Sequence, residues 1–178
     1  MKVLVTGGDG FIGSYLCPEL EKAGYEVAMG LRVNGDLADP RTIASLCEYF
    51  HPDVVVHLAA KTSRVLCELD PLMAIYDNAI ATMWVAEECG KHDIPLVYAS
   101  TSEVYGHQGD APCDERGPTR PTGIYALTKL WGEQVAQLYA PDKLLILRIS
   151  MPYGPFQSPA GFSPVGKGRA AIVNFLWQ

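Results

Sequence analysis

The sequence predicts an α/β fold with a doubly wound parallel sheet, in three layers with helices on both faces. Short apolar runs that suit strands buried on both faces alternate with longer segments whose apolar residues recur at helical spacing. Successive strand–helix–strand units are right-handed and place their strands parallel in one sheet. The 178 residues, 48% of them hydrophobic, suffice for one domain with a core of its own. We expect five or six strands in the order 3-2-1-4-5, with any extra strand at an edge.

Five apolar runs are the candidate strands. The first is the run of Val3, Leu4 and Val5, which begins almost at the N-terminus. The others lie at residues 25–31, 53–58, 94–100 and 143–149. Each run is short and rich in β-branched or aromatic residues, as strands in buried parallel sheets are.

Helices are expected between these runs, at residues 11–22, 40–49, 71–91 and 122–139. Gly24 is a typical stop for the first helix, and Pro18 inside it predicts a kink. Pro40 suits the first turn of the second helix. Thr122 is the candidate N-cap of the fourth. Residues 106–121 are rich in Gly, Pro and charge and are therefore expected to form a loop.

Composition and charge exclude several classes of function. A net charge of −6 argues against a broad surface for nucleic acids or anionic membranes. No apolar run approaches the length of a membrane span, and the N-terminal residues indicate strand and loop rather than a signal peptide. The five cysteines are scattered without a CxxC pair. We therefore expect reduced thiols in a cytoplasmic protein, with no disulfide and no metal site.

Three glycines between the first strand and the first helix form a candidate phosphate-binding turn. Gly7 permits a tight turn, Gly10 lets the backbone approach a pyrophosphate, and Gly13 lets the helix pack close to the strand. The helix N-terminus offers free N–H groups to phosphates. Because the triplet follows a strand and opens a helix, we interpret it as the dinucleotide-binding turn of a Rossmann-like domain rather than an ordinary strand–helix turn.

Tyr125 and Lys129 are the first candidates for chemistry. They lie four residues apart and therefore share a helix face. A tyrosine has a pKa of about 10, and a neighbouring cation together with the helix N-terminus would lower it toward the range of a general base. Thr101 follows the fourth strand and falls on the same sheet edge as the glycine turn. A surface Tyr and Lys without a special role is the alternative for this pair taken alone.

Seven segments jointly resemble the NAD-dependent epimerase/dehydratase family, which consists of extended short-chain dehydrogenases that act on nucleotide sugars. They occur in order along nearly the whole chain. The segments are TGGDGFIG at 6–13, GDLAD at 35–39, HLAA at 57–60, Asn78, STSEVYG at 100–106, YALTK at 125–129 and RISMPYGP at 148–155.

The resemblance implies a role for each matching residue. Tyr125 would be the general base and acid, Thr101 its hydroxyl partner, and Glu103 a base near the substrate or only a loop carboxylate. Lys129 would bond the nicotinamide ribose, and hydride would pass between a sugar carbon and the nicotinamide. The remaining cofactor-binding residues would be Gly7, Gly10, Phe11, Ile12, Gly13, Asp36, Leu37, Leu58, Ala59, Ala60, Asn78, Ser100 and Tyr125. For Asp36, a turn or helix-cap role carries equal weight.

The sequence departs from the family at the cofactor and the substrate. No acid ends the second strand, and Arg32 could meet a 2′-phosphate there, which favours NADP over NAD, although a solvated arginine is a comparable reading. Thr-Ser-Glu at 101–103 replaces the Thr-Asp-Glu of typical dehydratases, and Met151 stands where many relatives have asparagine. Only 23 residues follow Pro155. The C-terminal substrate domain would thus be largely missing.

These observations predict a cofactor domain at residues 1–155 and the start of a truncated substrate region at 156–178. The leading function is redox modification of a nucleotide sugar by epimerisation, dehydration or related chemistry, with NAD or NADP as cofactor. An NADPH-dependent 4-keto-sugar reductase is one alternative, and a cofactor-binding module without turnover is another. The expected partner is a nucleotide-sugar substrate, and a homodimer stays open.

Overall fold

The computed structural model describes residues 1–107 and 113–154, so the expected substrate region lies outside the described residues. Its sheet holds five strands, and every neighbouring pair is parallel. The sheet order is β2-β1-β3-β4-β5. The strands are β1 (Lys2–Thr6), β2 (Glu26–Gly30), β3 (Val54–His57), β4 (Leu96–Thr101) and β5 (Leu144–Ile149).

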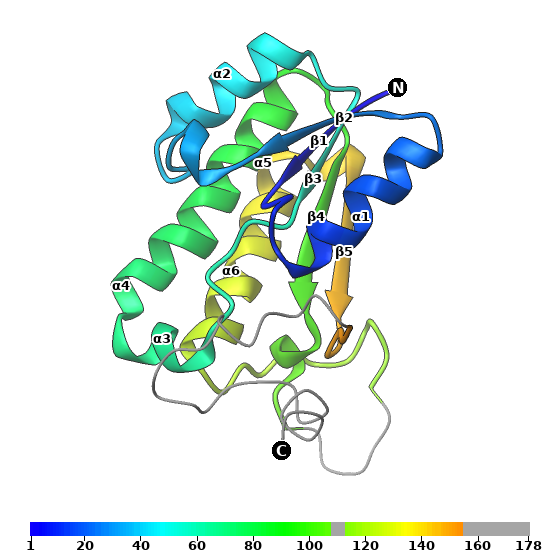
Figure 1. The fold of residues 1–178 in the computed structure, drawn as a ribbon. Coiled ribbons are helices and arrows are strands. Elements are labelled where there is room, and N and C mark those ends of the chain that lie inside the picture. The colour runs from blue at the N-terminus through cyan, green and yellow to red at the C-terminus, as the bar shows by residue number, and fades with distance from the viewer. Residues whose placement is uncertain (108–112, 155–178) are drawn as a thin grey trace.

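Helices cover both faces of the sheet, which confirms the predicted three-layer α/β/α class (Figure 1). On one face, α1 packs over the first strands; on the other lie α2, α5 and α6. A π-helical turn over Ile75–Ile80 joins α4 to α5. The helices are α1 (Phe11–Lys22), α2 (Pro40–Phe50), α3 (Arg64–Leu69), α4 (Pro71–Ala74), α5 (Ala81–Lys91) and α6 (Ile124–Tyr139).

The predicted strand order is wrong at one point. The third strand of the chain pairs with β1, not with the outer edge of β2. Val55 of β3 is completely buried, whereas β2 is exposed at Glu26 and Met29. A strand with apolar residues on both faces needs neighbours and cover on every side, so β3 occupies the interior and the more polar β2 forms the edge.

Two helix details also differ from expectation. Thr122 does not cap α6: the N-cap is Gly123, and the Ile124 N–H donates to the Glu68 carboxylate at 2.7 Å. Glu68 belongs to α3, a helix that the sequence pattern did not predict. Helix α1 spans Phe11–Lys22 with Pro18 inside it, as expected, and the kink at Pro18 stays a prediction.

The cysteines, the helix lengths and the exposed edge of the sheet describe the rest of the molecule. Four cysteines are buried and reduced, while Cys113 is exposed and also free. Within the part of the chain that the structure describes, no helix has the length and apolar character needed to cross a membrane. Leu145 and Leu147 of β5 stay 54% and 42% exposed, so the face of the sheet that carries α1 is incompletely covered at this edge by the described residues.

Candidate functional site

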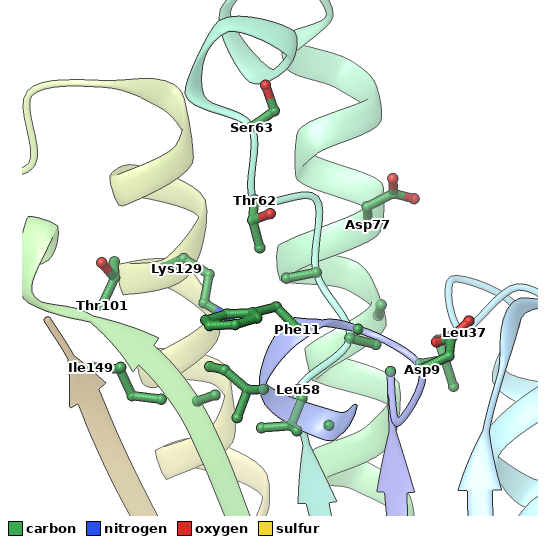
Figure 2. A pocket seen from close by; sticks show the side chains of 18 of the residues that line it. Asp9, Phe11, Leu37, Leu58, Thr62, Ser63, Asp77, Thr101, Lys129 and Ile149 are labelled. Carbon is green, nitrogen blue, oxygen red and sulfur yellow. The ribbon is translucent and has the colours of Figure 1, made fainter. Parts of the chain in front are cut away.

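One cavity of about 960 Å³ extends along the edge of the sheet where the parallel strands end (Figure 2). It is lined by residues that follow each of the five strands. In a doubly wound sheet this edge is the expected ligand site, and the volume is at the upper end for small-molecule pockets. We call its two extremes the β2 end, near Arg32 and Leu37, and the β4 end, near Thr101 and Lys129.

All but one of the site residues that the sequence predicts line this cavity. The exception is Asn78. The residues that do line it are Gly7, Gly10, Phe11, Ile12, Gly13, Arg32, Asp36, Leu37, Leu58, Ala59, Ala60, Ser100, Thr101, Glu103, Tyr125 and Lys129.

Asn78 is a structural tie instead of a cavity residue. It is completely buried, and its side-chain oxygen accepts a hydrogen bond from the Lys61 N–H at 2.7 Å. Its amide nitrogen donates to the Lys61 carbonyl at 3.1 Å and to the Thr128 hydroxyl at 3.0 Å. The amide therefore joins the segment after β3 to α6, and the prediction that Asn78 faces the cofactor is not supported by its position.

The glycine turn has the geometry expected of a phosphate cradle. Gly7 has a φ of +67°, and a Cβ there would lie 2.8 Å from the Cα and N of Ala59. A side chain at Gly13 would collide with the backbone of Gly8, so this glycine allows close packing against the turn itself. Helix α1 has Gly10 as N-cap, without a side-chain cap or an acid in its first turn. Its first N–H groups are thus free of side-chain caps and suited to an anion.

The β2 end contains a charge pair that includes an unpredicted residue. Arg32, in a turn after β2, places its Nη2 atom 3.4 Å from the Asp77 Oδ1 atom. Asp77 lies on the π-helical turn and lines the cavity. No sequence motif singled it out, because an isolated acid within a helix carries no local signal. Arg32 is therefore paired with a carboxylate of the protein, which weakens the argument from Arg32 for NADP.

Asp36 also lines this end and has a local role in the backbone. Its carboxylate accepts a hydrogen bond from the Ala38 N–H at 2.9 Å, as a turn residue does. The cap of α2 is a different acid, Asp39, which accepts from the Arg41 N–H at 3.0 Å. The turn alternative for Asp36 is observed, and the cap alternative belongs to Asp39.

At the β4 end, Thr101, Tyr125 and Lys129 meet in one wall of the cavity. Tyr125 lies in the first turn of α6, and Lys129 lies one turn further along the same helix. Burial, followed by the nearby Glu103 carboxylate, raises the pKa of Tyr125 to about 12, and a hydrogen bond with Thr101 acts in the opposite direction. The expected lowering of this pKa by Lys129 is not observed. The phenol is therefore protonated at neutral pH.

Lys129 is held in an apolar and aromatic setting. Its side chain is nearly fully buried, and its ammonium lies 4.2 Å from the centre of the Tyr98 ring. Burial lowers the pKa of Lys129 to about 7, while Glu133 on the next turn acts to raise it. A group balanced between its charged and neutral forms near pH 7 can exchange a proton or gain charge when an anion approaches.

An ion pair between the half-buried Arg148 and the buried Glu133 supports this wall. The Arg148 guanidinium binds the Glu133 carboxylate in a forked arrangement, with contacts of 2.6, 3.0 and 3.2 Å. The Ser100 hydroxyl donates to the same carboxylate. Glu133 thereby joins β4, β5 and α6. The Ser100 hydroxyl is already engaged, although the residue lines the cavity.

Two further residues were not singled out by sequence reasoning. His57 is completely buried, and its ring contacts the Thr6 hydroxyl at 2.6 Å and the Thr82 hydroxyl at 3.1 Å. Burial, then the charge of Lys129, lowers the pKa of His57 to about 3, so the ring is neutral and structural. Arg64 of α3 lies 3.6 Å from the Glu103 carboxylate at the cavity rim.

The family of the chain follows from comparison with known proteins. A sequence model of the NAD dependent epimerase/dehydratase family matches residues 3–175. The chain belongs to this family. The spore coat polysaccharide biosynthesis protein SpsK of Bacillus subtilis is 36% identical over 153 residues, which are 86% of this chain and 54% of that protein.

Solved structures of epimerase/dehydratase-like proteins share the fold closely. A dTDP-4-dehydrorhamnose reductase from Bacillus anthracis in complex with NADP superposes with a TM-score of 0.83 at 27% identity, covering 88% of this chain and 56% of that one. A UDP-glucose 4-epimerase from Thermus thermophilus in complex with NAD gives a TM-score of 0.84 at 31% identity, covering 90% and 60%. The chain spans about half the length of the curated relatives it matches.

Proposed function

We propose that the chain binds a nicotinamide dinucleotide in the cavity and forms the cofactor half of an oxidoreductase that modifies a nucleotide sugar. The observation that carries the proposal is the continuity of the cavity. The glycine turn at one point of its wall and the cluster of Thr101, Tyr125 and Lys129 at another line the same space. The family membership and the dinucleotides in two related structures support it.

The residues present fit such a cofactor. Gly7 and Gly13 provide backbone that no side chain obstructs, and the uncapped start of α1 would hold the pyrophosphate. Leu58 and the two small residues after it, Ala59 and Ala60, would let the dinucleotide lie close to the sheet edge. When bound, the nicotinamide ring supplies the hydride acceptor or donor for a sugar carbon.

The residues at the β4 end would handle the proton. Tyr125 is protonated at neutral pH because burial raises its pKa to about 12. It would give its proton to a sugar oxygen, or take one when a neighbouring positive charge lowers the pKa. Thr101 would orient the same oxygen through its hydroxyl. Lys129 would bond the ribose, and its charged form would return a proton to Tyr125.

The protonated state of Tyr125 favours a second candidate, reduction of a 4-keto sugar. In that reaction the tyrosine acts first as an acid toward the alkoxide that forms, which is the role that a protonated phenol performs without prior activation. Epimerisation or dehydration instead begins with removal of a proton. The two candidates differ in whether the cofactor is consumed.

Two measurements test the proposal in sequence. Calorimetric titration of the purified chain with NAD and with NADP should show one-to-one binding of at least one of them, and a folded chain that binds neither overturns it. Incubation with a panel of nucleotide sugars then separates the candidates. Product without net change in cofactor supports epimerisation or dehydration, stoichiometric oxidation of reduced cofactor supports the reductase, and binding without product supports a cofactor-binding module.

A further inference from the structure

The Asp77 carboxylate lacks a hydrogen bond on one oxygen, although its side chain is largely buried in the cavity wall. Its side chain is only 9% exposed, and its Oδ1 atom accepts no hydrogen bond from any described residue. The nearest cation, the Arg32 guanidinium, lies 3.4 Å away, beyond a good hydrogen bond. A buried carboxylate oxygen without a donor is costly. Oδ1 is covered on the side of Arg32, but the residue lines the cavity, so the Asp77 carboxylate can accept a hydrogen bond from a ligand there.

Asp77 lies on the π-helical turn and on the side of its helix that faces the cavity. Asp77 and Asn78 are consecutive, yet Asn78 bonds to Lys61 and Thr128 while Asp77 lines the cavity. Figure 2 shows Asp77 projecting from its helix on the side of the cavity where Asp9 and Leu37 lie, away from Thr101 and Lys129. π-helical turns are rare in proteins, and those that occur often lie at functional sites. Asp77 therefore belongs to the β2 end.

The charges at this end disfavour a phosphate. Among the described residues that line the cavity there, Arg32 is basic, whereas Asp9, Asp36 and Asp77 are acidic. A phosphate monoester carries about two negative charges at neutral pH. To reach Arg32, it would have to approach the Asp77 carboxylate and compete with it for the same guanidinium. Ribose hydroxyls, in contrast, can donate hydrogen bonds to a carboxylate that lines the cavity.

We propose that Asp77 is a specificity-determining residue of the cofactor site. Its carboxylate holds the Arg32 guanidinium and accepts a hydrogen bond from a ribose hydroxyl, so the site selects NAD and rejects the 2′-phosphate of NADP. The acid that the end of β2 lacks is supplied from a helix distant in sequence. This inference rests on the proposed function, because it requires that the cavity bind a dinucleotide.

The test is the ratio of NADP and NAD dissociation constants, measured by calorimetry for the 178-residue chain and for Asp77→Asn. Asparagine keeps the shape but removes the charge that repels phosphate and holds Arg32. The wild type should bind NAD at least about tenfold more tightly than NADP, and Asp77→Asn should reduce that preference by at least about tenfold. Glu87→Gln is the matched control: it removes one acid from α5, away from the cavity, and should leave the ratio unchanged.

Arg32→Ala provides the second arm. In the Asp77→Asn background, Arg32→Ala should weaken NADP binding by about tenfold, because the guanidinium that Asp77 no longer holds contacts the phosphate. In the wild-type background, the same substitution should weaken NADP binding by much less. If Asp77→Asn fails to fold, the ratio of NADP and NAD dissociation constants is measured for the wild type at increasing salt concentration. The preference for NAD should decrease as salt shortens the Debye length from about 10 Å to about 3 Å.

The outcomes separate the two proposals. A wild type that binds neither dinucleotide ends the proposed function and this inference with it. A wild type that binds NAD, together with an Asp77→Asn variant of unchanged ratio, overturns the inference alone. So does a wild type that prefers NADP, or an equal loss of affinity for both dinucleotides in a folded Asp77→Asn variant.

Discussion

Replacement of Gly7 by alanine tests the geometry of the turn between β1 and α1. At a φ of +67°, any L-residue occupies the left-handed region, which costs about 1–2 kcal/mol. The new Cβ would also lie 2.8 Å from the Cα and N of Ala59, which are backbone atoms of the segment after β3. Forced repacking of this kind costs about 1–3 kcal/mol more. The sum is a loss of about 2–5 kcal/mol.

Gly24 is the matched control for this substitution. Its φ of +84° imposes the same backbone penalty, but a Cβ there would meet nothing within 4 Å. Gly24→Ala should therefore lose only about 1–2 kcal/mol. Urea denaturation of both variants measures the free energy of unfolding, and calorimetry measures dinucleotide affinity. We expect affinity to fall at least about tenfold in Gly7→Ala only. Equal losses of stability within about 0.5 kcal/mol would refute the close approach of Gly7 to Ala59.

Three further substitutions test the β4 end. Tyr125→Phe keeps the ring and removes the proton-transferring oxygen, so turnover should fall about 10²–10⁴-fold while calorimetric cofactor affinity is retained; near-normal turnover contradicts the assignment. Lys129→Met removes an ammonium whose pKa is lowered from 10.5 to about 7. The unfolded chain binds more protons between these values, so wild-type stability rises with pH across that window. The variant should gain stability at pH 7, by at most about 5 kcal/mol, and lose the gain near pH 10.5; a gain independent of pH in denaturant titrations contradicts this. Glu133→Gln leaves the Arg148 guanidinium without its carboxylate and should cost about 3–5 kcal/mol in the same titrations, whereas a loss under about 1 kcal/mol would show the pair to be unimportant.

Local signals explain why much of the fold could be predicted. The valine run of β3 and the glycines around Gly10 are patterns within a few residues, so strands, turn and helices could be assigned from sequence. The carboxyl ends of parallel strands share one edge, which is why Thr101 was expected on the same edge as the glycine turn. The position of β3 beside β1 depends on how strands compete for the interior. No local pattern records that competition.

The site was predictable only where a residue sits in a local motif. Asp77 pairs with Arg32, which lies 45 positions earlier in the sequence, and it lies on a π-helical turn that no local sequence pattern predicts. Asn78 matched the family, yet its contacts are to Lys61 and Thr128. Charge proximity taken without burial predicts a lower pKa for Tyr125. In the folded protein, burial is the larger effect.

A crystal structure of the chain with NAD soaked into the cavity tests the central claim most directly. We expect the pyrophosphate over the turn from Gly7 to Gly13, the adenosine at the β2 end beside Asp77, and the nicotinamide at the β4 end beside Tyr125 and Lys129. Density for the dinucleotide in the reverse orientation, or at another surface with the cavity empty, would contradict this assignment of the cavity.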